Sequence, residues 1–237
     1  MNTQNKGLFK CGLKDGIPIA LGYLSVSFGF GISAVNGGLS PLAAVIISLT
    51  NLTSAGQVAG VEVILALGTL IEMALTQLTI NVRYSLMSLS LSQKLDQSFT
   101  LPHRLIASFG ITDEVFGVAS SKKDPLKPIY MYGLILLPFF GWTLGTLLGA
   151  VAGNILPPSV NSALGIAIYG MFVAIVLPPA KREMGVLAAS LISIGVSLAL
   201  AFIPLLSFIT SGFAIIVSAL AAAVVAALLF PIKEEDE

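Results

Sequence analysis

Charged and chemically reactive side chains are scarce in this chain. Asp, Glu, Lys and Arg make up 10% of the 237 residues, whereas about a quarter is usual in soluble domains. Cysteine, histidine and tryptophan occur once each, as Cys11, His103 and Trp142. A single cysteine excludes an internal disulfide, and one cysteine with one histidine is too few for a zinc cluster. The composition therefore excludes an ordinary soluble domain.

Enzyme and nucleic-acid motifs are missing as well. The sequence has no glycine-rich phosphate loop and no Gly-x-Ser-x-Gly elbow. The 12 acidic and 12 basic side chains cancel, and no basic patch is interleaved with aromatic residues. The sequence therefore indicates neither an enzyme nor a partner of nucleic acid, and it implies no metal and no cofactor.

Long hydrophobic runs are what the chain has instead. Hydrophobic residues make up 56% of the sequence. Most of the apolar runs approach or exceed the roughly 20 residues with which a helix spans a bilayer core. The runs are Ile17–Val35, Ile129–Ala152, Leu164–Leu177, Val186–Leu206 and Phe208–Phe230. An all-α, polytopic protein embedded in membrane lipids is predicted.

Basic residues gather on one side of the predicted spans. They are Lys6, Lys10 and Lys14, then Lys122, Lys123 and Lys127, then Lys181 and Arg182, and finally Lys233. The links 36–40 and 153–162 hold no Lys or Arg. The positive-inside rule then places both termini in the cytoplasm, which requires an even number of crossings.

The same reasoning divides the chain into three parts. The first apolar run is too long for a signal-peptide core, so it is interpreted as an uncleaved first span. Residues 1–15 are predicted to be a cytoplasmic N-terminal segment, residues 16–231 a single transmembrane transport domain, and residues 232–237 a cytoplasmic tail.

A break is predicted near residues 41–57. The apolar segment Pro41–Leu52 would be about 18 Å long as a helix, short of the ~30 Å core. It is either a re-entrant half-helix followed by one long span, or one of three crossing segments with a break near Ser54 to Gln57. The total is therefore six to eight crossings.

Polar residues follow this break where the rest of the chain is hydrocarbon. If Glu62 to Arg83 is one continuous helix, six of its polar side chains share an arc of about 100°: Glu62, Thr69, Glu72, Thr76, Thr79 and Arg83. Buried ionisable groups in membranes are costly and usually functional. The seam lines a solute path or carries a coupling proton, or it only satisfies neighbouring helices.

Arg83 stays charged at any depth, so it must reach the headgroups or find a partner. One function would be a fork of donors for a substrate carboxylate, and another a pair with Asp113 or Glu114. These two adjacent acids follow Thr112 in an otherwise apolar stretch. They hold a substrate ammonium, exchange a proton, or belong to a solvated loop.

Four glycines recur at four-residue spacing and therefore share one helical face: Gly141, Gly145, Gly149 and Gly153. Overlapping Gly-x-x-x-Gly units let helix backbones approach closely in membranes. These glycines are predicted to pack against a neighbouring helix or a partner chain.

Four motifs together resemble the AzlC family of branched-chain amino acid exporters. They are Asp15-Gly16-Ile17-Pro18; Ser48 through Ser54-Ala55-Gly56-Gln57; Asn81-Val82-Arg83-Tyr84 with Ser88-Leu89-Ser90-Leu91; and Thr112-Asp113-Glu114. Two positions depart from the family pattern. Val58 stands where an aromatic usually follows the glutamine, and Val82 where leucine is usual, which leaves the fine substrate specificity open.

The resemblance implies a multi-pass plasma-membrane subunit that exports leucine, isoleucine and valine, with methionine as a further candidate. It also implies a separate small membrane partner of the AzlD type. The residues that it assigns to substrate binding are Ser54, Gly56, Gln57, Asn81, Arg83, Asp113 and Glu114.

A mechanism follows from the chemistry of the substrate. An aliphatic zwitterion needs a cation or helix N-terminus for its carboxylate, an acid or carbonyl for its ammonium, and an apolar pocket. Coupling to the proton gradient would use an acid protonated on one side only, for which Glu72 and Asp113 are the candidates. Two alternatives stay open: an uncoupled channel or facilitator, and a non-transporting membrane scaffold.

Overall fold

The structure, a computed structural model, describes residues 3–153, 155, 157, 159, 167–206 and 208–230. Within these residues it has ten α-helices, one short 3₁₀ helix and no β-strand beyond an isolated bridge between Leu95 and Leu126. The predicted all-helical membrane class is confirmed. The number of crossings and the sidedness of the termini stay predictions, and the predicted tail at 232–237 lies outside the described residues.

Four of the described helices are long and apolar enough to cross a membrane. In chain order they belong to α1 (Thr3–Asn36), α7 (Pro128–Gly153), α10 (Met184–Phe202) and α11 (Ser211–Leu229). The other helices are α2 (Pro41–Thr50), α3 (Ala55–Leu65), α4 (Leu70–Ser92), α5 (Leu101–Phe109), α6 (Asp113–Ser120) and α9 (Ala167–Arg182).

The chain divides into two compact units, each described here by itself. Unit 1 comprises residues 1–57 and 81–168, and unit 2 comprises residues 58–80 and 169–237. The divisions fall inside helices α3, α4 and α9. Unit 1 therefore holds the start of α3 and the second half of α4.

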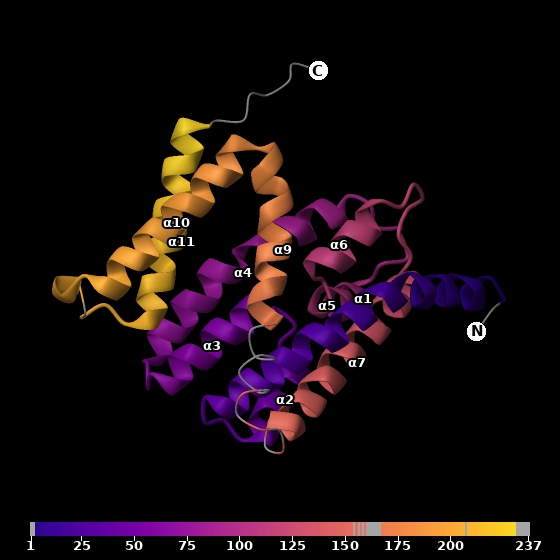
Figure 1. The fold of residues 1–237 in the computed structure, drawn as a ribbon. Helices are drawn as coiled ribbons and strands as arrows, with labels where there is room; N and C mark the ends of the chain where they lie inside the picture. Colours follow the sequence, from indigo (N-terminus) through magenta and orange to yellow (C-terminus); the bar gives the residue numbers. More distant parts are fainter. Residues whose placement is uncertain are drawn as a thin grey trace. The chain divides into compact units, whose positions relative to one another are not determined.

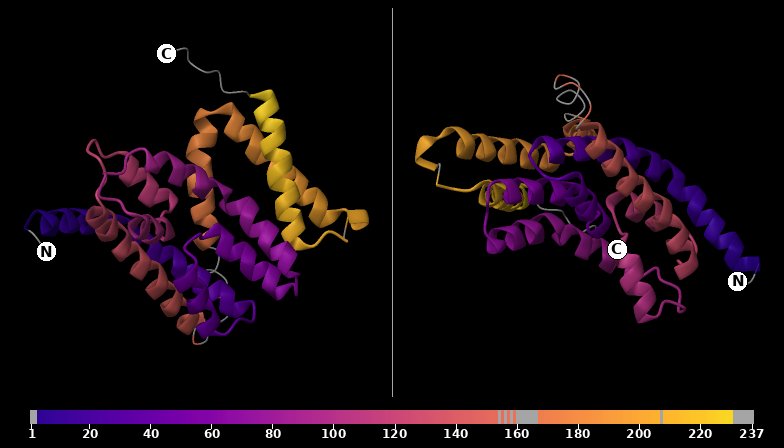
Figure 2. Two further views of the ribbon diagram at one scale, coloured as in Figure 1. Left: turned by 180° about the vertical axis from the view of Figure 1, so that it is seen from behind. Right: turned by 90° about the horizontal axis from the view of Figure 1, so that it is seen from below.

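Unit 1 is built on the pairing of α1 with α7, which lie side by side in Figures 1 and 2. A methyl group at Gly12 would meet the backbone of Tyr130 and Leu134, and one at Gly31 would meet that of Thr146. The later glycine of α1 meets the later residue of α7, so the two helices run in the same direction. Their small residues let the backbones touch.

The predicted glycine face of α7 lies in this contact. Gly141 faces Ala20, with 2.5 Å between its ideal Cβ position and the Ala20 carbonyl oxygen. Gly145 faces Leu24, and Gly149 faces Phe28, one turn further each time. Gly153, at the end of the series, would have only an ordinary contact of 3.5 Å to Ile32.

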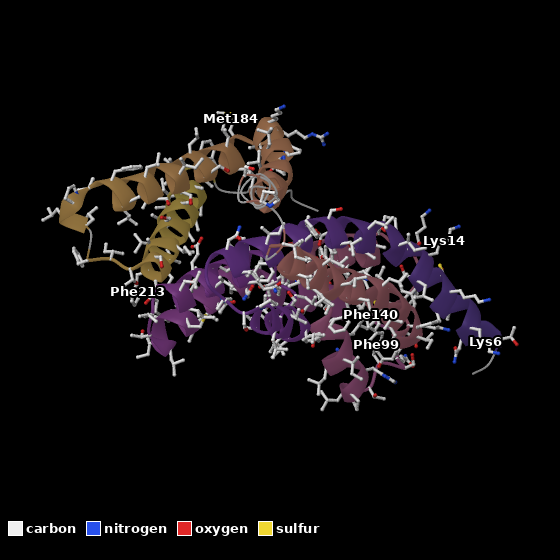
Figure 3. All side chains as sticks on the ribbon, turned by 60° about the horizontal axis from the view of Figure 1, so that its bottom comes forward. Lys6, Lys14, Phe99, Phe140, Met184 and Phe213 are labelled. Atoms are coloured by element: carbon white, nitrogen blue, oxygen red, sulfur yellow. The ribbon has the colours of Figure 1, made fainter. Side chains whose placement is uncertain are left out.

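Helix α1 extends well beyond the thickness of a bilayer. Its 34 residues correspond to about 51 Å, against a core of about 30 Å. Lys6 and Lys14 lie on its N-terminal part (Figure 3). The predicted N-terminal segment is thus the start of the first span's own helix.

Unit 2 contains the apolar pair α10 and α11, linked through the 3₁₀ turn η1 (Pro204–Leu206) and packed against each other (Figure 2). Among the described residues, α10 has no buried side chain. Exposed leucine, isoleucine and phenylalanine on both helices suit contact with lipid or with other membrane protein.

The premise of one continuous helix from Glu62 to Arg83 is wrong. Helix α3 ends at Leu65 and α4 begins at Leu70. Between them the Gly68 amide donates to the Val63 carbonyl at 2.9 Å and the Leu67 amide to Ile64 at 3.1 Å, with Leu67 at φ 54°. This is a Schellman motif, which ends a helix through one left-handed residue.

The end of α3 divides the predicted polar seam into two parts. Glu62 is exposed on α3, whereas Glu72 and Thr76 are buried on α4. Thr69 caps α4, because its hydroxyl accepts a hydrogen bond from the Glu72 amide at 3.1 Å. A single polar stripe through all six side chains therefore does not exist.

Candidate functional site

The predicted break separates α2 from α3 in unit 1. Asn51 to Ser54 leave helical geometry, and Ser54 adopts a left-handed backbone with φ 45°. The Asn51 side-chain oxygen accepts a hydrogen bond from the Thr53 amide at 3.2 Å. Such strained residues often cluster at functional sites, and interrupted helices are tolerated in membranes only where they are buried in protein or line a cavity.

A chain of hydrogen bonds starts from this break. Gln57, 1% exposed, donates from Nε2 to the Ser48 hydroxyl at 3.0 Å. The Ser48 and Thr146 hydroxyls are 2.7 Å apart, and Thr146 donates to the Trp142 carbonyl at 3.1 Å. The chain joins the break to the middle of α7.

Counting protons fixes the direction of this chain. Thr146 has one hydroxyl proton and gives it to Trp142, so Ser48 must be the donor to Thr146. The Ser48 oxygen can then only accept, which requires the amide nitrogen of Gln57 to face it. The carbonyl Oε1 of Gln57 is left buried with no hydrogen-bond partner in the described part of the chain.

A second polar group of unit 1 surrounds Arg83. Its Nη1 pairs with Asp113 Oδ2 at 2.6 Å, and its Nη2 donates to the Tyr84 hydroxyl at 3.1 Å. Side-chain exposures of 38% for Arg83 and 35% for Asp113 leave the pair partly accessible. Arg83 was expected to reach the headgroups, to bind a substrate carboxylate or to pair with an acid. The structure shows the pair with Asp113.

Asp113 and Glu114 stand in the first turn of α6, where acids are favoured by the helix dipole. The hydroxyl of Thr112 caps that turn by accepting a hydrogen bond from the Val115 amide at 3.3 Å. Burial raises the pKa of the Asp113 carboxyl, and the Arg83 guanidinium opposes that rise. The motif Thr112-Asp113-Glu114 is thus also a helix start.

The two polar groups are joined through aromatic side chains. Tyr23 donates from its hydroxyl to Glu114. Its ring meets the Trp142 ring edge-to-face at 5.2 Å between centroids. Since Trp142 also accepts from Thr146, direct contacts run from Gln57 through Ser48, Thr146, Trp142 and Tyr23 to Glu114.

The structure distributes the predicted substrate residues within unit 1 unevenly. It brings Arg83 and Asp113 together and places Ser54, Gly56 and Gln57 at the broken helix. Asn81 is half-buried on α4. No contact between Gln57 and Arg83 themselves is present, so the motifs meet only through the intermediate side chains.

Sequence reasoning did not select Tyr23, Trp142 or Thr146. Ser48 entered only as part of a motif. A hydroxyl in the middle of an apolar span was the available signal for Ser48 and Thr146, because it must be satisfied there. Single aromatic residues in such spans carry no comparable signal, and Trp142 had no constellation around it in the sequence.

Glu72, the other predicted proton carrier, is buried in unit 2 with 2% exposure. Its Oε1 accepts hydrogen bonds from the Gly212 amide at 2.9 Å and from the Thr210 hydroxyl. Both donors belong to the start of α11, where free amide groups favour an anion. Glu72 therefore ties the first turn of α4 to the first turn of α11.

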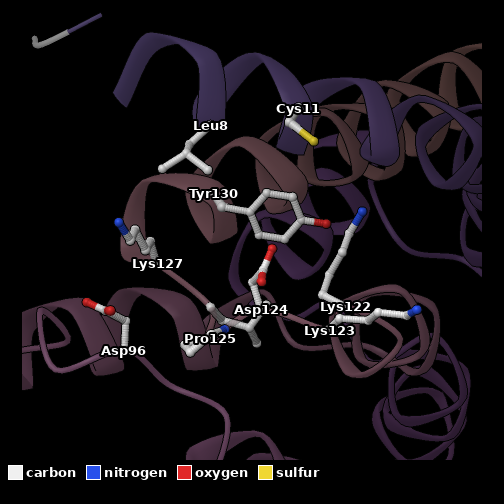
Figure 4. Close-up of a pocket in the computed structure, with 10 residues that line it drawn as sticks. Leu8, Cys11, Asp96, Lys122, Lys123, Asp124, Pro125, Lys127 and Tyr130 are labelled. Carbon is white, nitrogen blue, oxygen red and sulfur yellow. The ribbon is translucent and has the colours of Figure 1, made fainter. Parts of the chain in front are cut away.

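A cavity of about 440 Å³ opens beside the start of α7 (Figure 4). It is lined by Leu8, Cys11, Asp96, Lys122, Lys123, Asp124, Pro125, Leu126, Lys127 and Tyr130. Lys122 forms an ion pair with Asp15 at 2.7 Å, a bond that raises the pKa of the Lys122 ammonium. None of the predicted substrate residues lines this cavity, and the buried unpartnered carbonyl of Gln57 is the better indicator of a ligand.

Residues 18–156 match the protein-family model that is described as AzlC protein. This range contains the four motifs apart from the first residues of the Asp15 motif. It also contains every residue of the contact chain from Gln57 to Glu114.

Similar proteins come from bacteria and archaea. The chain is 31% identical over 182 residues to the inner membrane protein YgaZ of Escherichia coli (strain K12), covering 74% of each chain. It is 34% identical over 182 residues to an uncharacterized membrane protein of Archaeoglobus fulgidus, covering 76% of this chain and 80% of the relative. No solved structure matches.

Proposed function

The chain belongs to the AzlC family, and we propose that it is the large subunit of a branched-chain amino acid exporter in the plasma membrane. Leucine, isoleucine and valine are the proposed substrates, with methionine as a further candidate. Export is proposed to be coupled to the proton gradient through Glu72 or Asp113. A small AzlD-type membrane protein is the proposed partner.

The observation that carries this proposal is the buried carbonyl of Gln57, which has no hydrogen-bond partner among the described residues. A buried acceptor without a donor is costly, so such atoms are normally paired or waiting for a ligand. The ammonium of an amino acid is a donor of the right kind. The break also places the N-terminus of α3 next to Gln57, and the positive end of a helix dipole favours a carboxylate.

The polar cluster around Arg83 supports a second candidate position for the substrate in unit 1. Arg83 uses one nitrogen for Asp113 and one for Tyr84, and a guanidinium has five donor hydrogens. Donors therefore remain for a carboxylate. Asp113 and Glu114 supply acids for an ammonium, and the surrounding leucine and isoleucine side chains suit an aliphatic group.

Efflux of leucine from preloaded cells tests the proposal. Gln57→Met removes the amide at similar length, and we expect efflux to fall at least about tenfold, since a hydrogen bond to a charged group is worth ~1.5–3 kcal/mol. Gln93→Met is the matched control, because Gln93 is exposed in the turn after α4. It should leave efflux unchanged.

Three outcomes separate the proposal from its alternatives. Loss of efflux in Gln57→Met at normal expression supports a site at the break. Export that persists after a protonophore, but never against a gradient, would indicate an uncoupled facilitator. Wild-type efflux after combined substitution of Gln57, Arg83 and Asp113 would indicate a scaffold subunit.

A further inference from the structure

Glu72 is a buried carboxylate without a counter-charge. No ion pair to it is formed in the described residues, and the sequence from Met184 to Phe230 contains no charged side chain at all. On α3 the titratable neighbour in sequence is Glu62, which is exposed and also acidic. A buried anion of this kind is stable only when something supplies positive charge.

The start of α11 supplies part of that charge. A helix N-terminus carries roughly half a positive charge, and Glu72 Oε1 takes its two hydrogen bonds from Gly212 and Thr210. The other oxygen, Oε2, accepts no hydrogen bond within the described chain. The start of α11 therefore compensates only part of the negative charge, through one of the two carboxylate oxygens.

A second buried acceptor faces the same place. Thr76 is fully buried, and its hydroxyl has no partner among the residues described. A Cβ on Gly212 would lie 2.6 Å from Glu72 Oε1 and 2.9 Å from Thr76 Oγ1. Glu72 Oε1 and Thr76 Oγ1 therefore both lie beside Gly212, the second residue of α11.

Glycine also flanks the other carboxylate oxygen. A Cβ on Gly68 would lie 2.8 Å from Glu72 Oε2. A side chain at either position would meet the carboxylate, so glycine at 68 and 212 lets the backbone pack closely against both oxygens.

We propose that Glu72, Thr76 and Thr210 form a binding site for one monovalent metal cation, Na⁺. The ligands are all oxygen, which suits a hard cation, and a single carboxylate provides too little charge for a divalent ion. A role of this cation in transport rests on the proposed export function, in which Asp113 would then carry the proton. Cation binding itself does not.

Thermal stability of the purified full-length chain in detergent measures binding without any transport. NaCl replaces choline chloride at pH 8 and constant ionic strength. The wild type should gain about 3 °C in Tm, because a ligand that binds the folded state stabilises it.

Substitutions locate the ion. Glu72→Gln should abolish the response to Na⁺, and Gly212→Ala, whose methyl group would meet the Glu72 and Thr76 oxygens, should weaken it. Thr76→Val should abolish the response, whereas Thr76→Ser should preserve it. The matched controls Glu62→Gln and Thr79→Val, both more exposed, should respond like the wild type.

The proposal is overturned if the wild type shows no response to Na⁺, or if Glu72→Gln responds like the wild type. Should Glu72→Gln not fold, Gly212→Ala and Thr76→Val decide: wild-type responses in both variants overturn the site. A cation response without any leucine transport would contradict the export function alone.

Discussion

Gln57 owes its position to two hydroxyls that lie far from it in sequence. Ser48 and Thr146 have their single protons committed along the chain to the Trp142 carbonyl, so the Gln57 amide has one orientation. A glutamine held in this way presents a carbonyl of fixed direction. Preorganised polar groups of this kind lose little entropy when a ligand arrives.

The pair of Arg83 and Asp113 allows function and stability to be separated. Both side chains are more than a third exposed, and such pairs contribute less than about 1 kcal/mol to folding. We therefore expect Arg83→Ala and Asp113→Asn each to lower leucine efflux about tenfold while shifting Tm only slightly. The double variant should be no worse than the poorer single one, because the residues act together.

The other ion pair of unit 1 provides the control. Lys122 and Asp15 are 2.7 Å apart with similar exposure, but they lie away from the residues proposed to bind substrate. Lys122→Ala should leave efflux at the wild-type level. Unchanged efflux in Arg83→Ala and Asp113→Asn, at normal expression, would remove both residues from the site.

At the scale of the helix, the contact between α1 and α7 depends on glycine. A methyl at Gly145 would clash with the Leu24 carbonyl and the Ser27 hydroxyl, so Gly145→Ala must push the helices apart. Overpacking typically costs ~1–3 kcal/mol. We expect a lower Tm and poorer recovery of folded protein in detergent.

Gly153→Ala is the matched control on the same helical face. Its new methyl would make an ordinary 3.5 Å contact with Ile32, so its Tm should stay at that of the wild type. Equal Tm values for Gly145→Ala and Gly153→Ala would mean that the close approach of α1 and α7 does not stabilise the fold.

Helix ends were the least predictable elements. The sequence indicated the break near 41–57, because Pro41–Leu52 is too short to cross. It did not indicate the end of α3, since Leu67 takes the left-handed position where glycine or asparagine is usual. Leu67 is 92% exposed, so its side chain gives no packing signal either.

For the whole molecule, composition and hydropathy were sufficient for the class. The long apolar runs Ile17–Val35 and Ile129–Ala152 became α1 and α7, and the spacing of Gly141 to Gly149 matched their contact. Local patterns of this kind depend on neighbours in sequence, which a sequence displays directly.

The candidate site was less accessible to prediction because its contacts join distant segments. A pair of Arg83 with Asp113 or Glu114 was one of the alternatives that the sequence offered, but nothing in the sequence places Tyr23 against Glu114 or Ser48 against Thr146. Likewise, Glu72 stood out as a costly residue, while its partners at the start of α11 are 138 and 140 residues away. Such pairings arise from tertiary packing.

Counterflow of labelled leucine in liposomes tests the central claim most directly. The full-length chain is reconstituted with and without its proposed AzlD-type partner, and the vesicles are preloaded with unlabelled leucine or valine. The account predicts transient accumulation of label that Gln57→Met reduces at least about tenfold and Gln93→Met leaves intact. No counterflow in either preparation, or equal counterflow in Gln57→Met, would contradict it.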